Sequence, residues 1–141
     1  MDQIKKLSED KNFTAVDLGK LSLLSETANG KAFLKEMTQA TGTEISLSVL
    51  PAKTELPFFH THKQNEETYI ILSGSGKFQV DDQYWDIAEG SVVRVSPSGV
   101  RGMTNTSDEQ MVYIVVQSKE GSLEQYSMED GVLLEATPLW K

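Results

Sequence analysis

Apolar and polar side chains alternate with a period of two along much of this chain. Within Thr43–Leu50, isoleucine, leucine and valine take every second position, and the positions between them hold serine or glutamate. Side chains two residues apart lie on the same face of a strand, so this pattern predicts a half-buried β-strand. Helical periodicity is weak and predicts only one short helix, at Asp2–Leu7. The other predicted strands are Phe13–Leu18, Lys31–Thr38, Glu67–Leu72, Gly76–Val80, Gln83–Ile87, Ser91–Val95, Val100–Thr104 and Gln110–Gln117.

Residues typical of tight turns separate these predicted strands. The turn segments are Asn29-Gly30, Thr41-Gly42, Ser73–Gly76 (taken as a hairpin turn), Asp81-Asp82, Glu89-Gly90 and Pro97–Gly99. Turns recur about every 8–12 residues in the middle of the chain, a spacing typical of all-β sandwiches and barrels. We therefore predict one domain over residues 1–141, with a core at about 40–118, an N-terminal extension at 1–39 and a C-terminal tail at 119–141. The tail is expected to pack back onto the sheet or onto a partner chain.

The charge composition narrows the classes of partner. The chain has 13 Lys and Arg residues and 21 Asp and Glu residues, a net charge of −8. Nucleic-acid binding needs clustered basic side chains, so no nucleic-acid partner is expected. No apolar stretch approaches the roughly 18–20 residues that span a membrane, and the first residues lack the apolar segment of a signal peptide. We therefore expect a cytoplasmic protein with no membrane partner. The absence of cysteine excludes disulfides and thiolate metal sites.

The two histidines of the chain, His60 and His62, are separated by a single residue. On a strand they would point to the same face, roughly 6.5–7 Å apart at the backbone. Their imidazoles can then lean onto one metal ion, which lies about 2.0–2.2 Å from each ligating nitrogen. Glu67 opens the next predicted strand and shares a face with Tyr69, so a tight return would bring its carboxylate beside the imidazoles. Two nitrogens and one carboxylate suit Mn, Fe, Co, Ni, Cu or Zn and leave positions for water or substrate.

Two alternatives to this ligand set stay open. His60, His62 and Glu67 could form a hydrogen-bonded polar cluster that holds no metal. The adjacent carboxylate of Glu66 would replace Glu67 as a ligand if the return loop were one residue shorter. Glu66 points to the opposite face once the strand has begun, so we expect it to face solvent.

The segment that contains these residues resembles the sequence motifs of the cupin superfamily. The first cupin motif is a histidine, one residue, a second histidine, three or four residues, a glutamate, six residues and a glycine. Those positions are filled here by His60, His62, Glu67 and Gly74. The second motif is similar to the segment from Gly90 onward. It contains the Pro-x-Gly turn at Pro97–Gly99, with one extra residue before it, and an asparagine at Asn105, one place early.

The resemblance implies a cupin-type jelly-roll β-barrel (a double-stranded β-helix), often dimeric, with the metal or ligand inside the barrel mouth. It also exposes a departure. The second motif usually supplies a third histidine separated from Pro-x-Gly by two residues, and that position is Gly102 here. Because the chain has no other histidine, the usual four-ligand set is reduced to His60, His62 and Glu67.

Further candidate residues surround this predicted site. Tyr69 could donate a hydrogen bond to a substrate or act as the catalytic base, or it could be a core aromatic. Arg101 could clamp a substrate carboxylate or phosphate, or it could be an exposed loop arginine. Tyr113 and Gln117 share one face of the last strand, and which face lines the pocket is left open.

The sequence therefore predicts a cupin-like homodimer with a divalent-metal site that binds a small organic molecule, with or without transforming it. If it is an enzyme, the resemblance allows dioxygenase, isomerase, decarboxylase or lyase chemistry, with the metal as Lewis acid and template. The alternative is a non-catalytic small-molecule-binding cupin whose site is metal-free or vestigial.

Overall fold

The computed structural model describes residues 3–26 and 30–141, and its elements are almost all strands. Two short helical segments interrupt them, η1 at Leu21–Glu26 and α1 at Leu34–Thr38. No helix in the described ranges is both long and apolar enough to cross a membrane. The strands are β1 Lys5–Asp10, β2 Phe13–Asp17, β3 Lys31–Phe33, β4 Glu44–Leu50, β5 Thr54–Glu55, β6 Asn65–Ser73, β7 Ser75–Val80, β8 Gln83–Ala88, β9 Val92–Val95, β10 Arg101–Asn105 and β11 Met111–Lys119.

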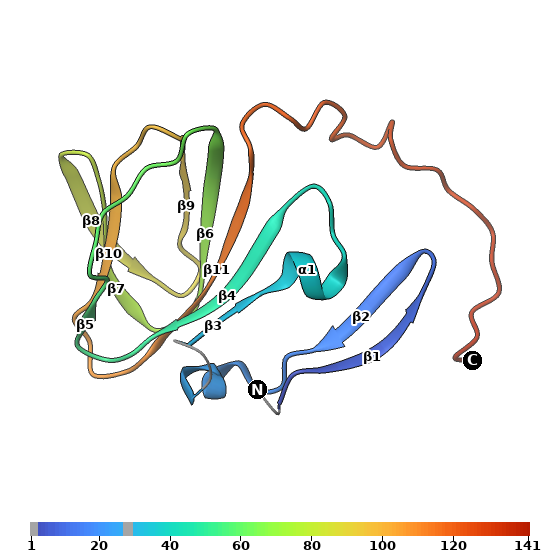
Figure 1. The fold of residues 1–141 in the computed structure, drawn as a ribbon, viewed down its shortest axis with the longest axis horizontal. Coiled ribbons are helices and arrows are strands. Elements are labelled where there is room, and N and C mark those ends of the chain that lie inside the picture. Colours follow the sequence, from blue (N-terminus) through green and yellow to red (C-terminus); the bar gives the residue numbers. More distant parts are fainter. Residues whose placement is uncertain (1–2, 27–29) are drawn as a thin grey trace.

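Two antiparallel sheets face one another and enclose the main core (Figure 1). One sheet has the strand order β3-β4-β11-β6-β9, and the other has the order β5-β10-β7-β8. The inward residues of β6 are Glu67, Tyr69 and Ile71, all buried, as the alternation predicts. Phe78 and Met103 meet them from the opposite sheet. The predicted all-β architecture is thus confirmed, and β1 and β2 form a separate two-stranded sheet.

β4 is buried on both of its faces for different reasons. Its serine and glutamate positions face the interior of the barrel, where Glu44 and Ser46 line a cavity. Its apolar positions, including Leu47 and Val49, face outward. The N-terminal residues cover them, with the fully buried side chain of Leu24 on η1 in the same apolar cluster. The N-terminal segment therefore forms a second apolar layer outside the five-stranded sheet.

The segment predicted as a hairpin turn at Ser73–Gly76 is instead a crossing between the two sheets. It joins β6 to β7, and these strands pair with different neighbours. Gly74 has φ +85°, in the left-handed region that favours glycine, and a Cβ there would lie 2.5 Å from the Gln110 carbonyl oxygen. A Cβ on Gly76 would collide with the Thr104 carbonyl. The two glycines let the chain turn away from β6 and pack closely on the opposite sheet.

Two predictions near the N-terminus are wrong. Lys5–Asp10, which overlaps the predicted helix at Asp2–Leu7, forms strand β1 and pairs with β2. The strand predicted at Lys31–Thr38 ends at Phe33, and α1 follows it. Asp2 and Asn29 lie outside the described residues. The other predicted strands are confirmed, with ends that differ by one or two residues.

The C-terminal tail does not pack back onto its own sheet. Figure 1 shows it leaving the end of β11 and running away from both sheets in a wide arc. Leu139 and Trp140 are 95% and 87% exposed. Of the two expectations for this segment, packing on its own sheet is wrong, and packing on a partner chain stays a prediction.

Candidate metal centre and cavity

The candidate site lies between the sheets, where the segment before β6 runs along the start of β10. His60 and Arg101 exchange two backbone hydrogen bonds, with N···O distances of 3.2 and 3.1 Å. The backbone N–H of His62 donates to the Pro97 carbonyl at 2.9 Å. These contacts fix the histidine segment to the second motif, so the two motifs meet in space although some 35 residues separate them.

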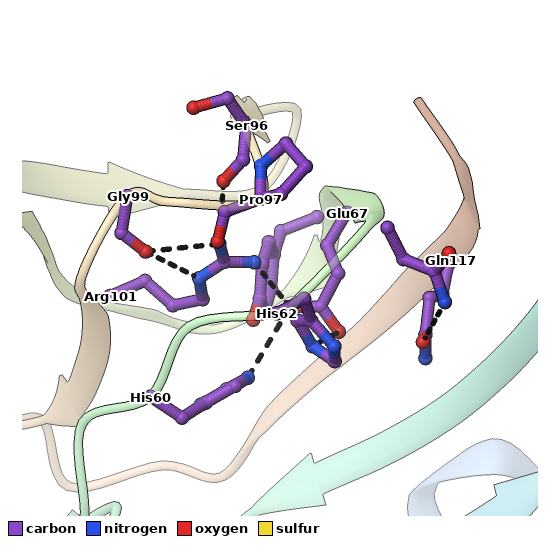
Figure 2. A network of polar contacts seen from close by, with 10 residues as sticks. His60, His62, Glu67, Ser96, Pro97, Gly99, Arg101 and Gln117 are labelled. Atoms are coloured by element: carbon purple, nitrogen blue, oxygen red, sulfur yellow. Dashed lines mark hydrogen bonds and ion pairs between the residues drawn. The ribbon is translucent and has the colours of Figure 1, made fainter. Parts of the chain in front are cut away.

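The structure brings His60, His62 and Glu67 together, as the spacing predicts. Figure 2 shows both imidazoles turned toward the Glu67 carboxylate. His60 Nε2 lies 3.5 Å from Oε1, and His62 Nε2 lies 3.3 Å from Oε2. One ligand atom from each residue falls within 4.8 Å of the others. Two atoms bound to one ion at about 2.1 Å are at most roughly 4.2 Å apart. Small side-chain rotations would therefore bring the three ligand atoms within bonding distance of a single ion.

His62 Nε2 is a buried nitrogen that the folded chain leaves without a hydrogen bond. Among the described residues it has no hydrogen-bond partner, since its contact with Glu67 Oε2 lacks hydrogen-bond geometry. Buried polar atoms in native proteins are nearly always paired with protein, water or a ligand. The nitrogen is therefore available to a metal ion, a water molecule or a ligand.

The sequence placed the missing ligand at Gly102, but the residue of β10 that lies beside Glu67 is Arg101. Its side chain is 1% exposed and points inward, so it is not an exposed loop arginine. Gly102 faces the other way, and a Cβ there would lie 2.5 Å from the Phe59 ring. The inward position is therefore Arg101, four residues before Asn105, because successive residues of β10 alternate between its faces.

Each of the three guanidinium nitrogens of Arg101 donates to a protein acceptor. Its Nη1 donates to Glu67 Oε1 at 2.8 Å, and its Nε donates to the Gly99 carbonyl at 3.1 Å. Its Nη2 donates to the carbonyls of Ser96, Gly99 and Pro97 (Figure 2). The Pro-x-Gly turn thus holds the arginine, and the arginine in turn holds Glu67.

The two oxygens of the Glu67 carboxylate have different partners. Oε1 accepts hydrogen bonds from Arg101 and from the Tyr69 hydroxyl, both at 2.8 Å. Oε2 faces His62. Burial alone would raise the pKa of Glu67, but the hydrogen bonds from Tyr69 and Arg101 and the nearby positive charge hold that pKa below its ordinary value. The carboxylate is therefore ionised, with one oxygen left for a further ligand.

The Tyr69 hydroxyl acts as a hydrogen-bond donor to Glu67 at this site. Burial, together with the Glu67 charge and hydrogen bond, strongly raises the pKa of Tyr69. Its hydroxyl therefore keeps its proton and orients Glu67 through the hydrogen bond to Oε1. Glu66 points away from the site and pairs with Arg94 at 2.7 Å.

A cavity of about 260 Å³ opens beside these residues. The inner face of β11 lines it with Tyr113 and Gln117, which settles the face that the sequence left open. Lys31 of β3 and Glu44 and Ser46 of β4 were missed by the sequence reasoning. The polar side of the alternation in β4 was the available signal. The other lining residues are Phe33, Leu56, Phe58, His60, His62, Glu67, Tyr69 and Val115.

The family of the chain follows from comparison with known proteins. A family model described as the cupin domain matches residues 46–117, about half of the chain and all of the site except Lys31, Phe33 and Glu44. This protein is a cupin. The expected double-stranded β-helix fold is confirmed by its structural relatives.

Two solved structures illustrate the relationship. A cupin protein from Bacteroides fragilis is 35% identical and superposes with a TM-score of 0.77, covering 89% of this chain and 100% of its own. A Klebsiella pneumoniae protein with a double-stranded β-helix domain is 15% identical, with a TM-score of 0.60 over 73% of this chain and 90% of its own. The second likeness concerns the fold alone. No protein with a curated description matches this cupin.

Proposed function

We propose that this cupin binds one divalent metal ion through His60, His62 and Glu67 and holds a small organic anion in the adjacent cavity. The observation that carries the proposal is the unpaired, buried Nε2 of His62 beside the open Oε2 of Glu67. A metal ion bound by both atoms would satisfy the orphaned nitrogen. The ion would supply Lewis-acid activation of a ligand oxygen.

The protonation states support metal binding. Metal ligands must be deprotonated, and the lowered pKa of Glu67 keeps its carboxylate ionised. The pKa of His60 is also lowered, chiefly by burial and further by the Arg101 and His62 charges, against the opposing effect of Glu67. Its imidazole is therefore neutral near pH 7 and able to donate its nitrogen lone pair.

The charge balance supports an anionic ligand. Glu67 and Arg101 neutralise each other, so a divalent ion would leave a net charge of two on the site. Lys31 adds a cation to the cavity wall, with its ammonium 5.3 Å from the centre of the Phe33 ring, and Glu44 adds a carboxylate to the same wall. In the described part of the chain, no carboxylate lies within ion-pair distance of this ammonium. A carboxylate or phosphate bound beside the ion would offset the positive charge that the ion leaves on the site.

The experiment is a calorimetric titration of chelator-treated protein with Zn²⁺ and, separately, Mn²⁺. We expect one ion per chain for at least one metal and an affinity at least about tenfold weaker in His62→Ala. Glu66→Gln is the matched control, because this neighbouring carboxylate faces away, and it should bind as the wild type does. Failure of both metals to bind, or wild-type affinity in His62→Ala, contradicts the metal site.

A second candidate function is anion binding without metal, and the Arg101–Glu67 ion pair favours it. That pair already neutralises the carboxylate that a metal would need. In this case small carboxylates should raise the melting temperature of protein kept in chelator. Lys31→Met should abolish that rise, whereas Lys35→Met, on exposed α1, should not.

A further inference from the structure

The C-terminal arm, residues 121–141, is an extended segment rich in exposed apolar side chains. Figure 1 shows it reaching far beyond the sheets. Large apolar residues in globular proteins are mostly buried, and disordered segments contain few of them. The exposed ones in the arm are Leu123 72%, Tyr126 83%, Met128 84%, Val132 79%, Leu133 90%, Leu134 84%, Leu139 95% and Trp140 87%.

The base of the arm is held firmly to the body. The backbone N–H of Glu120 donates to the Gln64 carbonyl at 3.1 Å. Its carboxylate accepts from Arg94 Nη2 at 3.0 Å. Beyond Ser122, every hydrogen bond of the described chain that involves the arm stays within the arm, as in Asp130 N–H to Ser127. The arm is therefore anchored to the body at Glu120, and beyond Ser122 its hydrogen bonds in the described chain do not reach the sheets.

We infer that this arm packs on a second copy of the same chain, in a reciprocal exchange that forms a dimer. If each of the eight apolar side chains buries about 80 Å², two arms remove roughly 1,300 Å² from water, which is within the range of stable interfaces. A two-fold exchange is closed, because each copy both gives an arm and receives one.

The body offers apolar surface to receive the arm. Val92 on β9 is 62% exposed, and Phe13 on β2 is 52% exposed. Every copy of the chain carries both an arm and these exposed residues. A second copy can therefore provide the apolar surface that an arm needs. The inference does not depend on what the cavity binds.

The first test measures the mass of the full chain by sedimentation equilibrium. We expect twice the chain mass of 15.7 kDa for the wild type. The double variant Leu133→Glu, Leu134→Glu should dissociate at least about tenfold more readily. The matched control, Glu129→Gln with Glu135→Gln, changes charge on the same arm without removing apolar area and should stay dimeric. A monomeric wild type, or a dimer equally tight in the leucine variant, overturns the proposal.

The second test asks which body the arm touches. Lys141 is the only lysine of the arm, so an amine-reactive cross-linker reports its position. ¹⁴N and ¹⁵N chains are mixed, diluted to allow exchange and reconcentrated. Cross-links from Lys141 to body lysines should include mixed-isotope pairs in the proportion expected for random pairing. Links only within one isotope show that the arm folds back on its own chain and overturn the exchange.

Discussion

Arg101 is the residue that most distinguishes this site from a four-ligand metal centre. Its guanidinium reaches the same carboxylate that would bind a metal, and a backbone turn holds it there. A fixed cation at this distance orients and ionises Glu67, and it also repels a divalent ion. Arg101 would therefore have two opposite effects on metal binding: it holds Glu67 ionised and in place, and its positive charge lowers the affinity of the site for a divalent ion.

Replacing Arg101 by histidine should restore a fourth ligand. We expect Arg101→His to bind Zn²⁺ at least about tenfold more tightly than the wild type, because a neutral nitrogen donor replaces a positive charge. Competition with a chromogenic chelator measures this. Arg101→Gln removes the charge without adding a nitrogen ligand of that type and should gain less. Equal affinities in the two variants would contradict the restored ligand, and near-ultraviolet circular dichroism checks that both fold.

The sequence could predict the inward position of Glu67 because strand periodicity determines which side chains of β6 share a face, whereas His60 and His62 lie outside the strands and were predicted from their spacing. It could not assign the inward position of β10 correctly, because that depends on where the Pro-x-Gly turn ends. A shift of one residue exchanges Arg101 and Gly102 between the two faces of the strand. Lys31 was missed because β3 lies far from the motifs in sequence and joins the cavity only through its pairing with β4.

The β6–β7 connection is the element on which the two-sheet arrangement depends. Gly74 combines a positive φ with a close approach to the Gln110 carbonyl, whereas Gly90 has φ +92° with open space around it. Gly90→Ala thus measures the conformational penalty alone, about 1 kcal/mol. Gly74→Ala adds a steric clash and should cost at least about 2 kcal/mol in the free energy of urea unfolding. Equal costs would show that the close approach relaxes without strain.

At the scale of elements, the sequence located most strands but not the partners of each strand. Ser73–Gly76 has the composition of a hairpin turn, yet β6 and β7 lie in different sheets. Local composition indicates that the chain bends, whereas the choice of partner is decided by long-range packing. The same limit applies to Lys5–Asp10, whose strand conformation depends on pairing with β2.

For the whole molecule, the N-terminal layer is part of the folded unit. Leu24 is fully buried against the outer face of the five-stranded sheet, and its neighbour Leu23 is 42% exposed. Leu24→Ala should destabilise the protein by about 2–5 kcal/mol, through lost burial and the cavity left behind. Leu23→Ala should cost less than about 1 kcal/mol.

Denaturant unfolding followed by tryptophan fluorescence tests this pair of variants. We expect one cooperative transition that moves to lower denaturant in Leu24→Ala, because the layer and the barrel unfold together. An unchanged main transition in Leu24→Ala would show that the N-terminal segment is an independent appendage.

The two-sided burial of β4 has a consequence for how this protein could be redesigned. Its outward residues secure the fold, and its inward residues Glu44 and Ser46 line the cavity. Substitutions at these two positions can reshape the chamber while the apolar anchor on the reverse side stays intact. A library that varies Ser46 and Glu44 is therefore a route to a cavity of different shape and charge. Ser46 is the first choice, because Glu44 also accepts a hydrogen bond from the Lys35 backbone N–H at 2.9 Å.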